Sequence, residues 1–190
     1  FWIDRAISWI EGWKSHSGHS LQGVNPSHPS HWNPPMESIF KINLDESLPK
    51  DELVSLDLFA RNHMGQILAA KYEPHQEFWE LAVAEAPTIL VGMMLSIERG
   101  WGDIIIESDC LMVIDAINHN NSGLQSFGTI IKIILSLHQC FSLCTFSFIK
   151  REGNNTAHLL VASGPFVTIQ FWVDNFPSLI CTSTYSDLCH

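Results

Sequence analysis

Three segments in the first half of the chain have the hydrophobic pattern of β-strands. Residues 39–44 and 54–60 change between apolar and polar at alternate positions, a period of two that is typical of strands with one buried face. A turn sequence with glycine at 62–65 then leads into a third segment, residues 66–72. The pattern therefore predicts three consecutive strands, the last two joined by a tight turn.

Longer apolar stretches follow, and they predict helices around two further strands. Residues 77–99 are mostly apolar, with acids in the first turn and Gly100 as a stop signal, and so predict a long helix. The three isoleucines within 103–107 predict a strand that is buried on both faces. The remaining expected elements are helices at 109–118 and 124–138, a strand at 141–149 and a helix beginning near residue 154. The order βββαβααβα predicts an α/β domain in which helices cover a mixed sheet.

The two ends of the chain differ from this central pattern. Residues 1–13 contain three Trp in an amphipathic arrangement that predicts a short helix, and a stretch rich in Ser, His, Pro, Gly and Asn follows as a linker. We therefore expect an N-terminal segment and linker at 1–31, one domain at 32–164 and an aromatic tail at 165–190 with no readable period. Because the sequence begins with Phe, we expect it to be a fragment or a processed product.

Composition and charge restrict the possible functions. Hydrophobic residues make up 46% of the chain, which is enough to build a core and argues against disorder. The formal net charge of −10 argues against tight non-specific nucleic-acid binding, which depends on Lys and Arg. A metal-dependent nuclease stays possible, because bound cations offset local negative charge.

Cysteine usage and hydropathy indicate the environment of the protein. The five cysteines form no C-x-x-C pair, which favours a reducing, intracellular compartment, nuclear or cytoplasmic, over a disulfide scaffold. No apolar run reaches the length of a membrane span, so we expect no membrane insertion.

Three carboxylates occupy positions that suggest a shared site. Asp45 ends the first predicted strand and Asp109 follows the Ile-rich one, at the strand edge where α/β sheets bind ligands. Glu85 is an isolated charge in the long apolar helix, where burial would require a cation or a hydrogen-bonding partner. Three hard oxygen donors suit Mg²⁺ or Mn²⁺.

Each acid also has a simpler interpretation, which is the commoner one for a single residue. Asp109 is placed to be the N-cap of the next helix, Asp45 to be a strand-end turn residue, and Glu85 to face a loop from its helix. The metal hypothesis depends on all three acids together.

Five segments in sequence order carry a resemblance to a known family. They are KINLD (41–45), RNHMGQILAA (61–70), AEA (84–86), IIIESDC (104–110) and KREGNNTAH (150–158). The set resembles the ribonuclease H-like domain of plant non-LTR retroelement reverse transcriptases and their relatives, over roughly residues 32–164. Trp32 with Pro34 and Pro35, and the segment DNFPSL (174–179), are also similar to that family.

The resemblance implies a fold, an activity and a set of ligands. The fold would be a five-stranded mixed sheet in the order 3-2-1-4-5 with helices on both faces. The activity would be cleavage of the RNA strand of an RNA–DNA hybrid with Mg²⁺ or Mn²⁺. Separately from the resemblance, we expect the chain to be a monomer. Asp45, Glu85 and Asp109 would match the first three metal-binding carboxylates, and His158 falls at the position of the fourth.

Four departures from the family pattern weaken the expected activity. His158 replaces a carboxylate with a softer nitrogen ligand, and Glu46 stands where the family has a small glycine. Asp57 lies in a second strand that lacks the expected glycine, and Pro87 lies two residues after Glu85, where a kink could displace that carboxylate.

Two other functions compete with a nuclease. The first is an inactive module on the same fold that binds nucleic acid or protein, because fold does not fix function. The second is a zinc site from paired histidines, although a His-rich linker is the commoner explanation of such spacing. The histidines concerned are His16, His19, His28 and His31.

Overall fold

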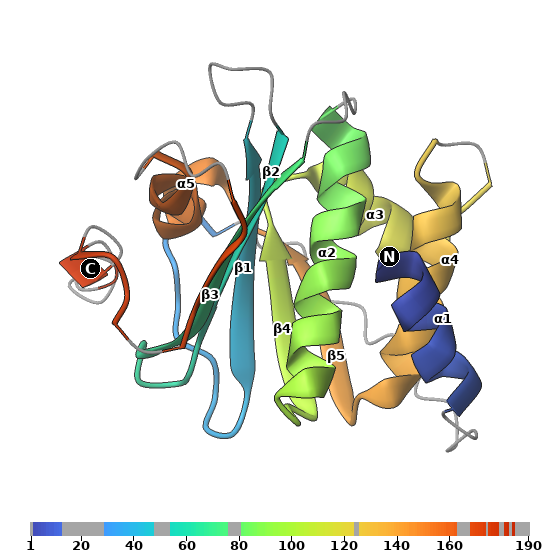
Figure 1. The fold of residues 1–190 in the computed structure, drawn as a ribbon, viewed down its shortest axis with the longest axis horizontal. Coiled ribbons are helices and arrows are strands. Elements are labelled where there is room, and N and C mark those ends of the chain that lie inside the picture. Colours follow the sequence, from blue (N-terminus) through green and yellow to red (C-terminus); the bar gives the residue numbers. More distant parts are fainter. Residues whose placement is uncertain are drawn as a thin grey trace.

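A computed structural model describes most of the chain and shows a six-stranded mixed sheet (Figure 1). The described residues are 2–12, 29–47, 54–75, 81–123, 126–162, 168–173, 175–178, 181, 182 and 184. Among them the strands lie in the order β5-β4-β1-β2-β3-β6. The expected order 3-2-1-4-5 is confirmed for the first five strands.

The sheet is antiparallel on one side of β1 and parallel on the other. β1 (Phe40–Ser47), β2 (Val54–Arg61) and β3 (Ile67–His75) pair antiparallel in sequence order. β4 (Asp103–Ser108) and β5 (Leu143–Phe148) extend the sheet parallel to β1. Parallel pairing requires a crossover connection, which explains why helices separate these strands in the sequence.

The expectation of only five strands was wrong. β6 (Gln170–Trp172) lies in the aromatic tail and pairs antiparallel with β3, Lys71 opposite Phe171. A strand of three residues is too short to produce a visible period of two, so the sequence pattern does not reveal it. Trp172 packs with Phe59 and Ala70 in a small apolar cluster beside this pairing.

Helices cover both faces of the sheet, as expected (Figure 1). α2 (Leu81–Glu98), α3 (Leu111–Asn118) and α4 (Gly128–Leu137) lie on one face, and α1 (Trp2–Gly12) packs against α4. α5 (Asn155–Ala162) packs against β1 and β2 on the other face. Short 3-10 helices follow α4 (His138–Cys140) and precede α5 (Arg151–Asn154).

The main core lies between the sheet and α2, and a glycine lets them approach closely. A Cβ on Gly92 would lie 3.2 Å from the Leu44 side chain and 3.4 Å from that of Ile42. Ile42 and Leu44 of β1 are fully buried and face α2. Because successive side chains of a strand point to opposite faces, those at 41, 43 and 45 face away from α2, toward α5. The face of each β1 side chain is thereby fixed.

Pro87 does not interrupt α2. The helix continues from Leu81 to Glu98 with Pro87 inside it. Gly100 lies two residues after the helix with φ of +69°, and the Trp101 amide donates to the Ser96 carbonyl, a termination that favours glycine. Pro87 removes one backbone hydrogen bond without ending the helix.

Two further expectations from the sequence concern a zinc site and membrane insertion. His16, His19 and His28 of the proposed zinc cluster lie outside the described residues, while His31 is described and exposed. Among the described residues, no helix combines the length and hydropathy needed to cross a membrane.

The close approach of α2 to β1 gives a stability prediction. Gly92→Leu should lower the free energy of unfolding by about 1–3 kcal/mol, because the new side chain overpacks against Leu44. Gly123→Leu is the control, since a Cβ there meets no atom within 4 Å, and its effect should stay within about 0.5 kcal/mol. Urea denaturation measures both, and equal midpoints for the two variants would contradict the packing described.

Candidate metal centre

The structure brings Asp45, Glu85 and Asp109 together. Each offers a carboxylate oxygen, and the three oxygens lie within 4.8 Å of one another. Asp45 is 2% exposed and Glu85 0% exposed, while Asp109 is partly exposed. Among the described residues, this is the group of acidic, His or Cys side chains close enough to hold one ion.

Parallel strand pairing explains the meeting of the two aspartates. Asn43 of β1 pairs with Glu107 of β4 in parallel register, so both strands end at the same edge of the sheet. Asp45 lies two residues beyond Asn43 and Asp109 two residues beyond Glu107. The equal spacing places both carboxylates at corresponding heights on adjacent strands.

Ser108 connects Glu85 to the end of β4. Its hydroxyl donates to Glu85 Oε2 at 3.0 Å and accepts a hydrogen bond from the Cys110 amide at 3.0 Å.

The N-cap of α3 is Cys110, without a side-chain capping bond, so the interpretation of Asp109 as that N-cap was wrong. Pro87 does not displace Glu85 from the site, since Glu85 lies with the two aspartates.

Burial and the carboxylates of the site raise the pKa values of two neighbouring groups. Burial raises the pKa of the Cys110 thiol, and the Glu85 and Asp109 carboxylates raise it further. Burial likewise raises the pKa of Asp57 well above its ordinary value, and Asp45 adds to the effect. Burial is the larger cause in each case, and the neighbouring carboxylates add a smaller effect because they disfavour further negative charge.

The fourth expected ligand stays a prediction. His158 belongs to α5, which packs against β1 and β2, but its side chain lies outside the described part of the structure. The side chain of Glu46, the other departure near Asp45, lies outside it too.

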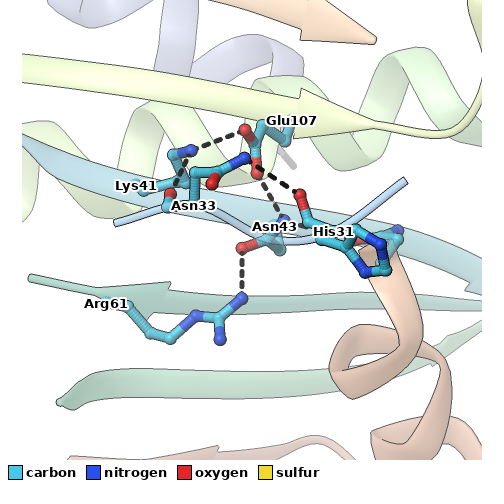
Figure 2. Close-up of polar contacts among 7 residues, drawn as sticks. His31, Asn33, Lys41, Asn43, Arg61 and Glu107 are labelled. Atoms are coloured by element: carbon cyan, nitrogen blue, oxygen red, sulfur yellow. Dashed lines mark hydrogen bonds and ion pairs between the residues drawn. The ribbon is translucent and has the colours of Figure 1, made fainter. Parts of the chain in front are cut away.

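A buried polar network joins β1 to β4 (Figure 2). Glu107 accepts from Lys41 Nζ at 2.7 Å and from Asn43 Nδ2 at 2.9 Å. Lys41 also donates to the Asn33 carbonyl at 2.7 Å. Lys41, Asn43 and Glu107 are at most 6% exposed, so these bonds are shielded from water.

The same network extends to β2 and to the start of α5. Arg61 donates to Asn43 Oδ1 at 3.1 Å, and its guanidinium lies 3.5 Å from the centre of the Trp32 ring. Asn154 donates to the Leu44 carbonyl at 2.6 Å, one residue before Asp45. The network thus joins β1, which carries Asp45, to β4 and to the residue directly before α5.

This network was not predicted from the sequence. One signal was available in Glu107, a charged residue directly after the three buried isoleucines of β4. A charge in such a strand requires a buried partner, which here is Lys41. The partner itself is 66 positions away in the chain and has no local signature.

The donor set of the centre fits a hard divalent cation. All three groups are carboxylates, the ligand type that Mg²⁺ and Mn²⁺ prefer. Three carboxylates at this separation repel one another unless protons or a cation offset their charge. The residues present therefore fit a divalent cation.

The fold and the acidic centre define a ribonuclease H-like domain. The structure resembles RNase H1 from the halophilic archaeon Halobacterium salinarum, with a TM-score of 0.53, 12% identity and coverage of 64% of this chain and 93% of that one. It also resembles the N-terminal RNase H domain of a Mycobacterium tuberculosis protein, with a TM-score of 0.58, 14% identity and coverage of 64% and 89%. The prototype foamy virus protease-reverse transcriptase matches with a TM-score of 0.54 and 14% identity, over 79% of this chain and 23% of that one.

Residues 55–164 match the model of the family described as reverse transcriptase-like, and the chain belongs to this family. None of the curated proteins compared with the chain matches it.

The buried ion pair yields a test of the network. Glu107→Gln should lower the free energy of unfolding by about 3–5 kcal/mol, because it leaves the Lys41 ammonium buried without its counter-charge. The control is Glu98→Gln in the exposed pair with Arg5, with an expected cost of about 0–1 kcal/mol. Urea denaturation distinguishes the two, and a Lys41→Met/Glu107→Gln double variant should recover part of the loss. If Glu107→Gln and Glu98→Gln unfold at the same urea concentration, the network does not stabilise the sheet.

Proposed function

We propose that this protein is a divalent-metal-dependent endonuclease that cleaves the RNA strand of RNA–DNA hybrids. The observation that carries the proposal is the group of three carboxylates, two of them buried, within 4.8 Å at the common end of two parallel strands. Stability alone does not favour such a group, because like charges repel in a low-dielectric site. Metal-dependent hydrolysis at phosphorus is a function that requires it.

Three kinds of similarity support the hybrid as substrate. The fold is that of proteins described as RNase H, and one structure of similar fold is a foamy viral protease-reverse transcriptase in complex with an RNA/DNA hybrid. Family membership adds the reverse transcriptase-like context. We also propose that the domain derives from a plant retroelement.

The carboxylates have distinct structural roles in this proposal. Asp45 of β1 and Asp109 directly after β4 would hold the ion, and Glu85 would complete the site from α2. Ser108 orients the Glu85 carboxylate through its hydrogen bond. Bound divalent cations supply Lewis acidity toward phosphate oxygens and activate water.

Two exposed cations are placed to contact the nucleic-acid backbone. Lys150 and Arg151 follow β5, which is parallel to β1 and β4, so they lie at the same edge of the sheet as the acids. Cations at this edge would position phosphates without reading bases. The chain has only 10 Lys and Arg, so binding would depend on the metal as well.

Substitution of one carboxylate tests the nuclease directly. Asp109→Asn keeps the side-chain volume and removes one charge, and cleavage of a labelled RNA–DNA hybrid should fall by about 100-fold or more, beyond the 10–100-fold typical of outer-shell changes. Circular dichroism checks that the variant folds. Cleavage by the natural chain that persists in excess chelator would contradict metal dependence.

The residue at position 158 tests the fourth ligand. A nitrogen donor at His158 is a poorer ligand for Mg²⁺ than for Mn²⁺, so cleavage by the natural chain should be faster with Mn²⁺. His158→Asp should raise the Mg²⁺-dependent rate and narrow the difference between the metals. If neither the natural chain nor this variant cleaves the hybrid with either metal, the interaction-module function replaces the nuclease.

A further inference from the structure

Asp57 is a buried carboxylate beside the metal centre that the family pattern does not assign. It lies in β2, directly opposite Asp45 of β1 in the antiparallel register. Side chains of opposed residues in paired strands point to the same face, so Asp57 and Asp45 are direct neighbours on the face that α5 covers. Asp57 is 0% exposed.

Only one of the two Asp57 oxygens is satisfied. Ser55 donates to Oδ2 at 2.7 Å. Oδ1 is buried and has no hydrogen-bond partner among the described residues. On its other side Asp57 faces Tyr72 of β3, whose hydroxyl is hydrogen-bonded to Ser55 and not to the free oxygen.

A buried carboxylate oxygen without a partner is strongly destabilising unless a cation or a proton compensates it. The neighbour across the strand makes the cost higher, because Asp45 carries the same charge. The nearby cations Lys41 and Arg61 are already engaged by Glu107 and Asn43. A divalent ion between Asp45 and Asp57 would satisfy both carboxylates.

We propose that Asp57 is a further metal ligand of this centre and supplies the carboxylate that is absent at His158. This inference rests on the proposed function, since it assumes that Asp45 binds a divalent cation. Asp57 comes from β2 instead of α5, so the negative charge of the ligand set is restored from a different element on the same face of the sheet. The centre then contains four carboxylates: Asp45, Asp57, Glu85 and Asp109.

Calorimetric titration of Mn²⁺ and Mg²⁺ into the full chain tests this inference. Asp57→Asn should weaken binding of either ion by about 10-fold or more, as expected for loss of a charged ligand. Asn has the shape of a protonated aspartate. If Asp57 only holds a proton, the variant binds both ions as tightly as the natural chain, which would overturn the inference.

Two further variants separate the possible failures. Glu73→Gln is the matched control, a buried acid on β3 that pairs with Lys71 beside α2, away from the centre, and it should leave metal affinity unchanged. Asp109→Asn should weaken binding whether or not Asp57 is a ligand. If Asp109→Asn and Asp57→Asn both have no effect, the proposed function fails. If only Asp57→Asn has no effect, this inference fails alone.

A measurement on the unsubstituted chain covers the case in which Asp57→Asn does not fold. The carboxyl carbon of Asp57, observed by ¹³C NMR, should shift on saturation with Mg²⁺ together with that of Asp45. The carboxyl carbon of Glu73 should not shift. An Asp57 resonance that does not respond to Mg²⁺ while Asp45 responds would overturn the assignment.

Discussion

Parallel pairing of β1 with β4 is the constraint on which the rest of the structure depends. The register of Asn43 with Glu107 sets the relative height of the two strand ends, and therefore the distance between the aspartates that follow them. The same pair of side chains is hydrogen-bonded, so the register is fixed by a buried interaction as well as by the backbone ladder. A shift by one residue would turn Asp45 to the opposite face of the sheet and separate the carboxylates.

The face of β1 that lies toward α5 is divided into two electrostatic zones. Lys41 and Arg61 lie at one end of this face, where Glu107, Asn43 and the Trp32 ring engage them. Asp45 and Asp57 lie at the other end, opposite each other. Asn43 lies between the zones and bonds to groups in both β4 and the segment before α5. Separation of the charges keeps the cations from neutralising the acidic centre by direct ion pairing.

Those features of the fold that have a local cause could be predicted from the sequence. Alternation in β1 and the apolar run of β4 located the strands, and the expected strand ends pointed to Asp45 and Asp109. The expectation that Asp45 ends its strand was wrong, because β1 continues to Ser47. Glu85 was found because a lone charge in an apolar helix is conspicuous. Side chains that meet across long sequence separations could not be predicted this way. Asn154 and the Leu44 carbonyl are 110 positions apart. Asn43 is a single polar residue on a strand, and the local sequence does not indicate its buried hydrogen bonds. The period of two does not tell whether the polar face meets water or other protein groups.

β6 is synthesised long after β3, the strand with which it pairs. β3 is complete at residue 75, but the strand that covers its outer edge begins only at residue 170. While the intervening part is made, the hydrogen-bonding groups of β3 are open to other chains, the usual starting point of aggregation. Ribosomal synthesis at about 5–20 residues per second leaves that edge uncovered for roughly 5–20 seconds. Chaperone demand during translation should therefore be concentrated in this interval, before Gln170–Trp172 emerges.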